Sequence, residues 1–104
     1  MYNINITDTN YGQKLTIGFD KSVTATNLEL GAYVESKLEQ LELGGELCLV
    51  NGAASLVIAF TMSKYINNRF AAVAVFDPGL QGYVVTNSKN PKYRLHTLIK
   101  EDEL

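Results

Sequence analysis

Residues 46–79 read as a strand, a tight turn, a helix and a second strand, and this order constrains the fold more than any other part of the chain. The first strand is ELCLV, the turn and helix start are NGAASL, and the second strand, AAVAVF, is followed by Asp77. A helix between two strands favours parallel pairing, which brings the ends of both strands to one edge of a sheet. We therefore expect Asn51-Gly52, the helix start near Ser55, and Asp77 to meet at that edge. Open α/β sheets bind ligands there, and a helix N-terminus offers unpaired N–H groups to an anion.

The first 45 residues are assigned from hydrophobic periodicity and capping signals. Apolar and polar residues alternate over residues 2–6 and 15–19, which predicts two strands joined by a turn. Thr26 and Glu29 form a T-x-x-E capping box, so a helix is expected to begin there and to end at the two glycines 44–45.

The helix at about residues 54–67 is apolar nearly all round in its first half. We expect it to be deeply buried, with a subunit contact as one way of covering it. The strand AAVAVF suits a central position covered on both faces, GYVVTN pairs with it as a hairpin, and a last alternating strand ends at Ile99. This order predicts one α/β domain over residues 1–100, in three layers, with a mixed sheet of five to six strands and helices packed on its faces. Residues 101–104 are expected to form a solvated acidic tail.

Charge is divided unevenly along the chain. The net charge is −2, but residues 47–100 carry six lysines and arginines against the single acid Asp77, whereas residues 1–46 are acidic. This asymmetry indicates a local anionic ligand rather than coating by DNA, and a solvated surface of mixed charge explains it equally well.

The sequence also bears on the compartment. No apolar run approaches the roughly 20 residues that a membrane-spanning helix needs, and no secretory signal is visible. The single cysteine, Cys48, lies in an apolar strand and is expected to be buried and reduced. We therefore expect a cytoplasmic protein with no membrane partner.

Most signatures of catalysis and metal binding are missing from the sequence. The lone histidine, His96, is expected to be a surface residue, and there is no zinc spacing, Walker loop or G-x-G-x-x-G motif. Asp77 is the most conspicuous polar residue, because it directly follows an apolar strand. The alternative is that Asp77-Pro78 simply starts a turn, and the residues alone slightly favour that reading.

Four stretches between residues 15 and 99 carry a resemblance to a known family: NGAASLVIAF, MSKYINN, AVAVFDPGLQGYVV and NSKNPKYRLHTLI. The order and approximate spacing of these stretches resemble those of motifs in the Csx-three-type accessory proteins of type III CRISPR antiviral systems, which are ring nucleases. The resemblance implies a small CARF-like, Rossmann-like domain that binds cyclic tetra-adenylate, the second messenger of those systems. In the family this ring is cleaved to linear fragments, often with manganese, at sites shared between subunits.

The carry-over of the family's functional residues is incomplete. The family's acid falls on Asp77, but its histidines fall on Lys64, on Asn67 or Asn68, and on Lys89. Every metal-binding histidine is thus replaced, so we expect no metal cofactor, and manganese is implied by the resemblance alone. A lysine can neutralise a phosphate where a metal would otherwise supply positive charge.

The first functional hypothesis is therefore a metal-independent ring nuclease, a hydrolase that acts on cyclic oligoadenylate. Lys64, with Lys89 and Arg94, would hold the phosphates while a ribose 2′-OH attacks its own phosphorus. Asp77 would take the hydroxyl proton or hold a lysine in place. Catalysis is assigned to Asp77 and Lys64, and ligand binding to Asn51, Gly52, Ser55, Asn67, Asn68, Lys89 and Arg94.

Two other hypotheses stay open. One is a cyclic-oligoadenylate binder without chemistry, a sponge or a sensor, which the loss of the histidines favours. The other is a structural module in which the apolar helix 54–67 drives oligomerisation and no nucleotide binds. Because a cyclic oligonucleotide is rotationally symmetric, the nucleotide hypotheses predict a homodimer or a larger homo-oligomer.

Overall fold

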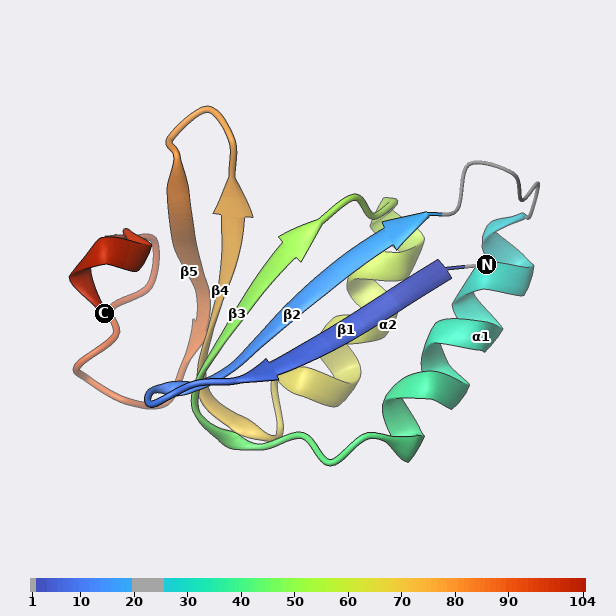
Figure 1. Ribbon diagram of the computed structural model, residues 1–104, viewed down its shortest axis with the longest axis horizontal. Helices are drawn as coiled ribbons and strands as arrows, with labels where there is room; N and C mark the ends of the chain where they lie inside the picture. Colours follow the sequence, from blue (N-terminus) through green and yellow to red (C-terminus); the bar gives the residue numbers. More distant parts are fainter. Residues whose placement is uncertain (1, 20–25) are drawn as a thin grey trace.

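The computed structural model of the protein describes residues 2–19 and 26–104 (Figure 1). The chain begins with a β-hairpin, alternates between strands and helices from residue 12 to residue 77, and ends in strands and an irregular segment. The elements are β1 (Tyr2–Asp8), β2 (Gly12–Phe19), α1 (Asn27–Gln40), β3 (Gly45–Gly52), α2 (Leu56–Ile66), β4 (Phe70–Asp77), β5 (Gly82–Ser88), β6 (Leu98–Ile99) and the 3-10 helix η1 (Glu101–Glu103).

The six strands form one mixed sheet in the order β1-β2-β3-β4-β5-β6. The central strands β2, β3 and β4 are parallel, and each of β1, β5 and β6 runs antiparallel to its neighbour. The predicted α/β class and mixed sheet are confirmed.

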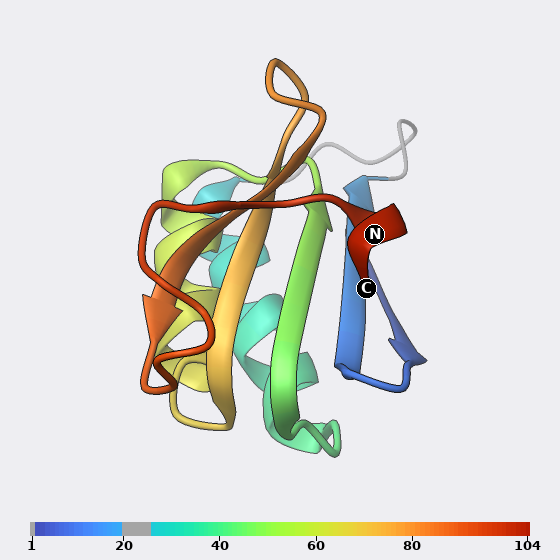
Figure 2. The ribbon, with the colours of Figure 1, turned by 90° about the vertical axis from the view of Figure 1, so that its left-hand side faces the viewer.

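The layering differs from the expectation, because both helices lie on the same face of the sheet (Figures 1 and 2). The units β2–α1–β3 and β3–α2–β4 carry the chain in the same direction across the sheet. Crossovers of the usual right hand then place both helices on one side. The opposite face is crossed by the segment after β5, so the third layer is irregular chain rather than a helix (Figure 2).

Burial on both faces of β3 explains its unbroken apolar sequence. Cys48 and Val50 face the helices, whereas Leu47 and Leu49 belong to the cluster on the other face. Burial raises the pKa of the Cys48 thiol to about 12, since the thiolate would be desolvated there. The prediction of a buried cysteine is confirmed.

Helix α1 begins as predicted but ends earlier. The Thr26 hydroxyl accepts a hydrogen bond from the Glu29 N–H at 3.3 Å, which confirms the cap. The helix ends at Gln40 rather than at the two glycines, because Leu41 and Leu43 pack against the core in the connection to β3.

Helix α2 is only half buried, which contradicts the expectation of deep burial within the chain. Ile58, Met62 and Ile66 face the core at helical spacing. Leu56 and Phe60 on the outer side are 76% and 73% exposed.

The C-terminal segment is fastened to the sheet by polar contacts. The Tyr93 hydroxyl donates to Glu46 Oε1 at 3.2 Å, and Lys14 Nζ lies 2.9 Å from Glu101 Oε2. The hydrogen bond with Glu101 raises the pKa of the Lys14 ammonium. Residues 101–104 are exposed as expected, but Glu101 docks them on β2.

Gln13 is a buried polar side chain whose amide joins the β1–β2 hairpin to the α1–β3 connection. Its Nε2 donates to Asp8 Oδ1 at 3.0 Å and to the Glu42 carbonyl at 3.2 Å. Its Oε1 accepts from the Gly44 N–H at 3.3 Å. These bonds link the edge hairpin to the rest of the domain.

Replacing Gln13 by leucine is expected to lower the free energy of unfolding by about 1–2 kcal/mol, because three hydrogen bonds are lost at a buried position. Urea denaturation measures this change. The exposed Gln40 supplies the matched control, since Gln40→Leu should leave the midpoint nearly unchanged. Equal midpoints for Gln13→Leu and the wild type would contradict the structural role of this amide.

Candidate functional site

The residues assigned to a site divide between two ends of the sheet. Because β3 and β4 are parallel, with Val50 paired to Val75, the ends of both strands are level. Asn51-Gly52 and Asp77 therefore share the carboxyl edge, as predicted, together with the N-terminus of α2.

The basic residues lie at the other end. Helix α2 runs back along the sheet, so Lys64 in its last turn and Asn67-Asn68 after it lie near the start of β4. Strand β5 is antiparallel to β4 and ends there, where the Lys89 N–H donates to the Ala71 carbonyl at 2.8 Å. This cationic end, defined by Lys64, Lys89 and Arg94, is the opposite edge from Asp77.

The expectation that Lys64 and Asp77 meet within one chain is therefore wrong. Strand β4 runs from Phe70 to Asp77, and eight residues at roughly 3.3 Å each span on the order of 25 Å. A crossover helix must run antiparallel to the strands that it connects, so its last turn returns to the end where the next strand starts.

Asp77 makes the contacts of a turn residue. Its Oδ1 accepts from the Gly79 N–H at 2.8 Å and from the Leu80 N–H at 3.2 Å, which fixes the β4–β5 turn. The alternative that Asp77-Pro78 starts a turn is confirmed.

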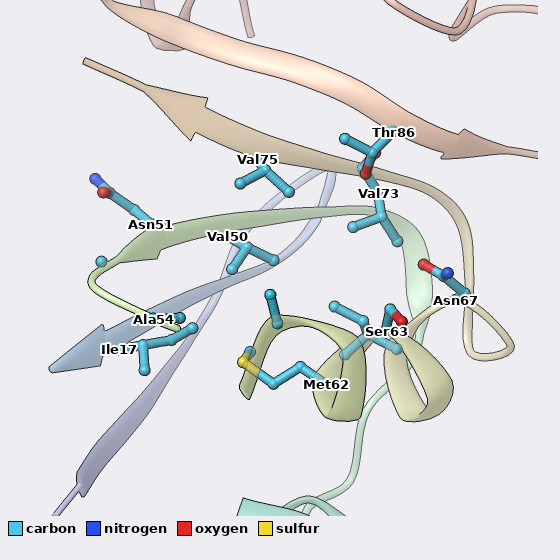
Figure 3. A pocket seen from close by; sticks show the side chains of 13 residues that line it. Ile17, Val50, Asn51, Ala54, Met62, Ser63, Asn67, Val73, Val75 and Thr86 are labelled. Carbon is cyan, nitrogen blue, oxygen red and sulfur yellow. The ribbon is translucent and has the colours of Figure 1, made fainter. Parts of the chain in front are cut away.

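Structural roles also account for the other residues at the carboxyl edge. The Ser55 hydroxyl caps α2 by accepting from the Ile58 N–H at 3.3 Å. Gly52 has a φ of +131° and lies so close to β2 that a Cβ atom would collide with the Ile17 carbonyl. Asn51 differs from these two, because it is among the residues that line the cavity between α2 and the sheet (Figure 3).

The structure brings two of the predicted ligand residues together at the cationic end. Lys89 and Arg94 line one hollow of about 330 Å³ in the loop after β5. The loop is shaped by its own hydrogen bonds, with the Ser88 hydroxyl donating to the Asn90 carbonyl at 2.9 Å, and it is anchored by the buried Tyr93. The hollow is thus built from fixed backbone.

The charges of the cationic end are not neutralised within the described residues 2–19 and 26–104. The ion pairs in that part of the chain are Lys14–Glu101 and Lys92–Glu46. Lys64, Lys89 and Arg94 take part in neither, so their charges are available to an anionic ligand.

A second cavity, of about 260 Å³, lies between α2 and the sheet (Figure 3). The sequence did not predict the cavity itself, but three of the predicted ligand residues, Asn51, Gly52 and Asn67, are among those that line it. Its lining comes from α2 and from strands β2 to β5, with Thr86 contributed by β5. Ser63 and Thr86 are among its polar residues, and their hydroxyls donate to backbone carbonyls. No charged residue is among those that line it, so it does not suit a phosphate.

Side chains that could ligate a metal do not gather in groups of three or more within the described residues 2–19 and 26–104. The helices found there are too short or too polar to cross a membrane.

No protein-family model matches the chain, and no curated protein matches it either. The resemblance to the ring nucleases therefore stays a prediction that depends on the four sequence stretches quoted above. The two ends of the sheet differ in their chemistry. The cationic end suits an anion, whereas Ser55 and Asp77 at the carboxyl edge are used in a helix cap and a turn.

The role of Asp77 in the turn predicts a difference between two substitutions. Asp77→Ala removes the acceptor of two backbone N–H groups and should destabilise the protein by about 1 kcal/mol. Asp77→Asn retains a side-chain oxygen at the same position and should unfold at nearly the wild-type temperature. Thermal denaturation followed by circular dichroism compares them, and equal losses in both variants would contradict the turn role.

Proposed function

We propose that this protein binds a cyclic oligoadenylate, with cyclic tetra-adenylate as the expected ring, through its cationic end. The observation that carries the proposal is that Lys89 and Arg94 line one hollow at the same end of the sheet as Lys64, without carboxylate partners among the described residues. Arginine and lysine bind phosphodiester oxygens through charge-assisted hydrogen bonds. Asn67 and Asn68 lie at the same end and offer amide groups to a base or a ribose.

Binding is supported more directly than cleavage. Within one chain, Asp77 and Lys64 lie at opposite ends of the sheet. One copy therefore does not place Asp77 beside the lysine that would neutralise the phosphate. The proposed role is therefore that of a binder, a sponge or a sensor of the messenger. A cytoplasmic location is part of this proposal, and the buried thiol of Cys48 suits a reducing compartment.

Replacing Lys89 or Arg94 by alanine should weaken binding of cyclic tetra-adenylate about 10- to 100-fold each, because a charge-assisted contact is worth roughly 1.5–3 kcal/mol. Isothermal titration calorimetry measures the affinity, which should also fall with added salt. Lys100→Ala is the matched control, since the exposed Lys100 follows Ile99, which pairs with Tyr83 beside the Asp77–Gly82 turn at the opposite end of the sheet.

The proposal fails if wild-type protein gives no binding heat with cyclic tri-, tetra- or hexa-adenylate. It also fails if Lys100→Ala weakens binding as much as Lys89→Ala does. The absence of binding heat would leave the hypothesis of a structural module that binds no nucleotide.

Cleavage of the ring is a second candidate, favoured by the position of Asp77 and Lys64 at opposite ends of one sheet. Two copies stacked end to end would bring Asp77 of one beside Lys64 of the other. The family resemblance implies shared sites of this kind.

Mixing two variants tests a shared site. Lys64→Ala and Asp77→Asn should each leave radiolabelled cyclic tetra-adenylate intact, whereas their mixture should restore part of the wild-type cleavage, because some interfaces then carry both native residues. The assay is run with EDTA and with manganese. An intact ring after prolonged incubation with excess wild-type protein would remove cleavage as a function and leave binding untouched.

A further inference from the structure

The outer side of α2 presents an apolar surface that the chain itself does not cover. Leu56 is 76% exposed, Phe60 73% and Val57 48%, and Val75 on the neighbouring β4 is 41% exposed. We call these four residues the apolar face. Single exposed apolar side chains are ordinary, but Leu56 and Phe60, four residues apart on one side of α2, form a group that marks an interaction surface.

The apolar face continues into the cavity between α2 and the sheet. Ala59 and Ser63 line that cavity, and Leu56 lies on the same side of the helix by its spacing of three and seven residues from them. Val75 belongs both to the face and to the cavity lining. Phe60, which projects from α2, and the apolar cavity between α2 and the sheet therefore lie next to each other on one surface.

A surface that carries both a projection and a matching hollow is complementary to itself. In a two-fold dimer the same patch contacts itself, so the projection of each copy can enter the hollow of the other. The cavity of about 260 Å³ is large enough for a phenyl ring, since cavities of about 150 Å³ in proteins accept benzene. The absence of charged residues from its lining means that two acidic copies do not bring like charges together there.

The exposed area of the four side chains supplies a large part, but not all, of what a stable interface between two copies needs. From their exposed fractions, the four side chains present roughly 450 Å² per copy, so pairing would bury about 900 Å² before the rim is counted. Stable interfaces begin at about 1,200 Å² in total. The small exposed residues Gly52, Ala53 and Ala54 at the rim allow close approach and extend the contact.

We propose that the apolar face is the interface of a two-fold homodimer in which Phe60 of each copy enters the α2 cavity of the other. The interface uses neither the cationic end nor Asp77, so it does not rest on the proposed nucleotide function. It accounts for an α2 sequence that is apolar nearly all round although one chain buries only half of the helix.

Sedimentation velocity without nucleotide tests the interface. Wild-type protein at micromolar concentration should sediment as a dimer, and Phe60→Glu should raise the dissociation constant by at least roughly 100-fold, because a buried aromatic anchor becomes a charge in both copies. Leu80→Glu is the matched control, since Leu80 is a 55% exposed leucine in the β4–β5 turn, and should leave the dimer intact. Both substituted residues are mostly exposed, so circular dichroism should show native folding.

A third variant tests where the Phe60 ring sits. Thr86→Trp places a large ring in the cavity from β5 and leaves Phe60 in place, and it should dissociate the dimer as well. A wild-type monomer would overturn the proposal and assign the apolar face to another occupant. If Phe60→Glu remains a dimer, the interface lies elsewhere. If Thr86→Trp remains a dimer, the Phe60 ring does not occupy the α2 cavity of the other copy.

Discussion

The parallel pairing of β3 with β4 through α2 is the constraint on which the rest of the structure depends. It buries both faces of the sheet centre, and it requires α2 to run back against the strands. The same crossover that brings Asn51-Gly52 and Asp77 to one edge therefore carries Lys64 to the other. The separation of Asp77 from Lys64 is a consequence of the topology and not of any side-chain detail.

This separation changes what each end of the domain can do. At the carboxyl edge, the polar groups of Ser55 and Asp77 are engaged by backbone N–H groups that would otherwise lack partners. At the opposite end, the loop after β5 holds Lys89 and Arg94 around one hollow. Among the residues that the structure describes, lysine and arginine side chains outside ion pairs gather at the second of these ends, which is why the proposed function is binding there.

The sequence predicted the elements well where the signals are local. The T-x-x-E box at Thr26 gave the start of α1, and the apolar run of β3 gave a strand covered on both faces. It failed where the outcome depends on spatial direction. Lys64 and Asp77 are only 13 positions apart in the chain, and neither capping nor periodicity states that a helix and a strand run in opposite directions between them. The α2 cavity was not predicted for a related reason, since it depends on how α2 packs on the sheet rather than on any motif.

Whether cyclic tetra-adenylate binds at the cationic end is best tested by amide chemical-shift mapping of the isotope-labelled protein during titration, because this measurement locates the ligand as well as detecting it. Binding at the cationic end predicts shifts concentrated at residues 64–68 and 88–95, with little change at residues 51–55 and 77–80. Shifts concentrated at the carboxyl edge, or none at all at saturating ligand, would contradict it.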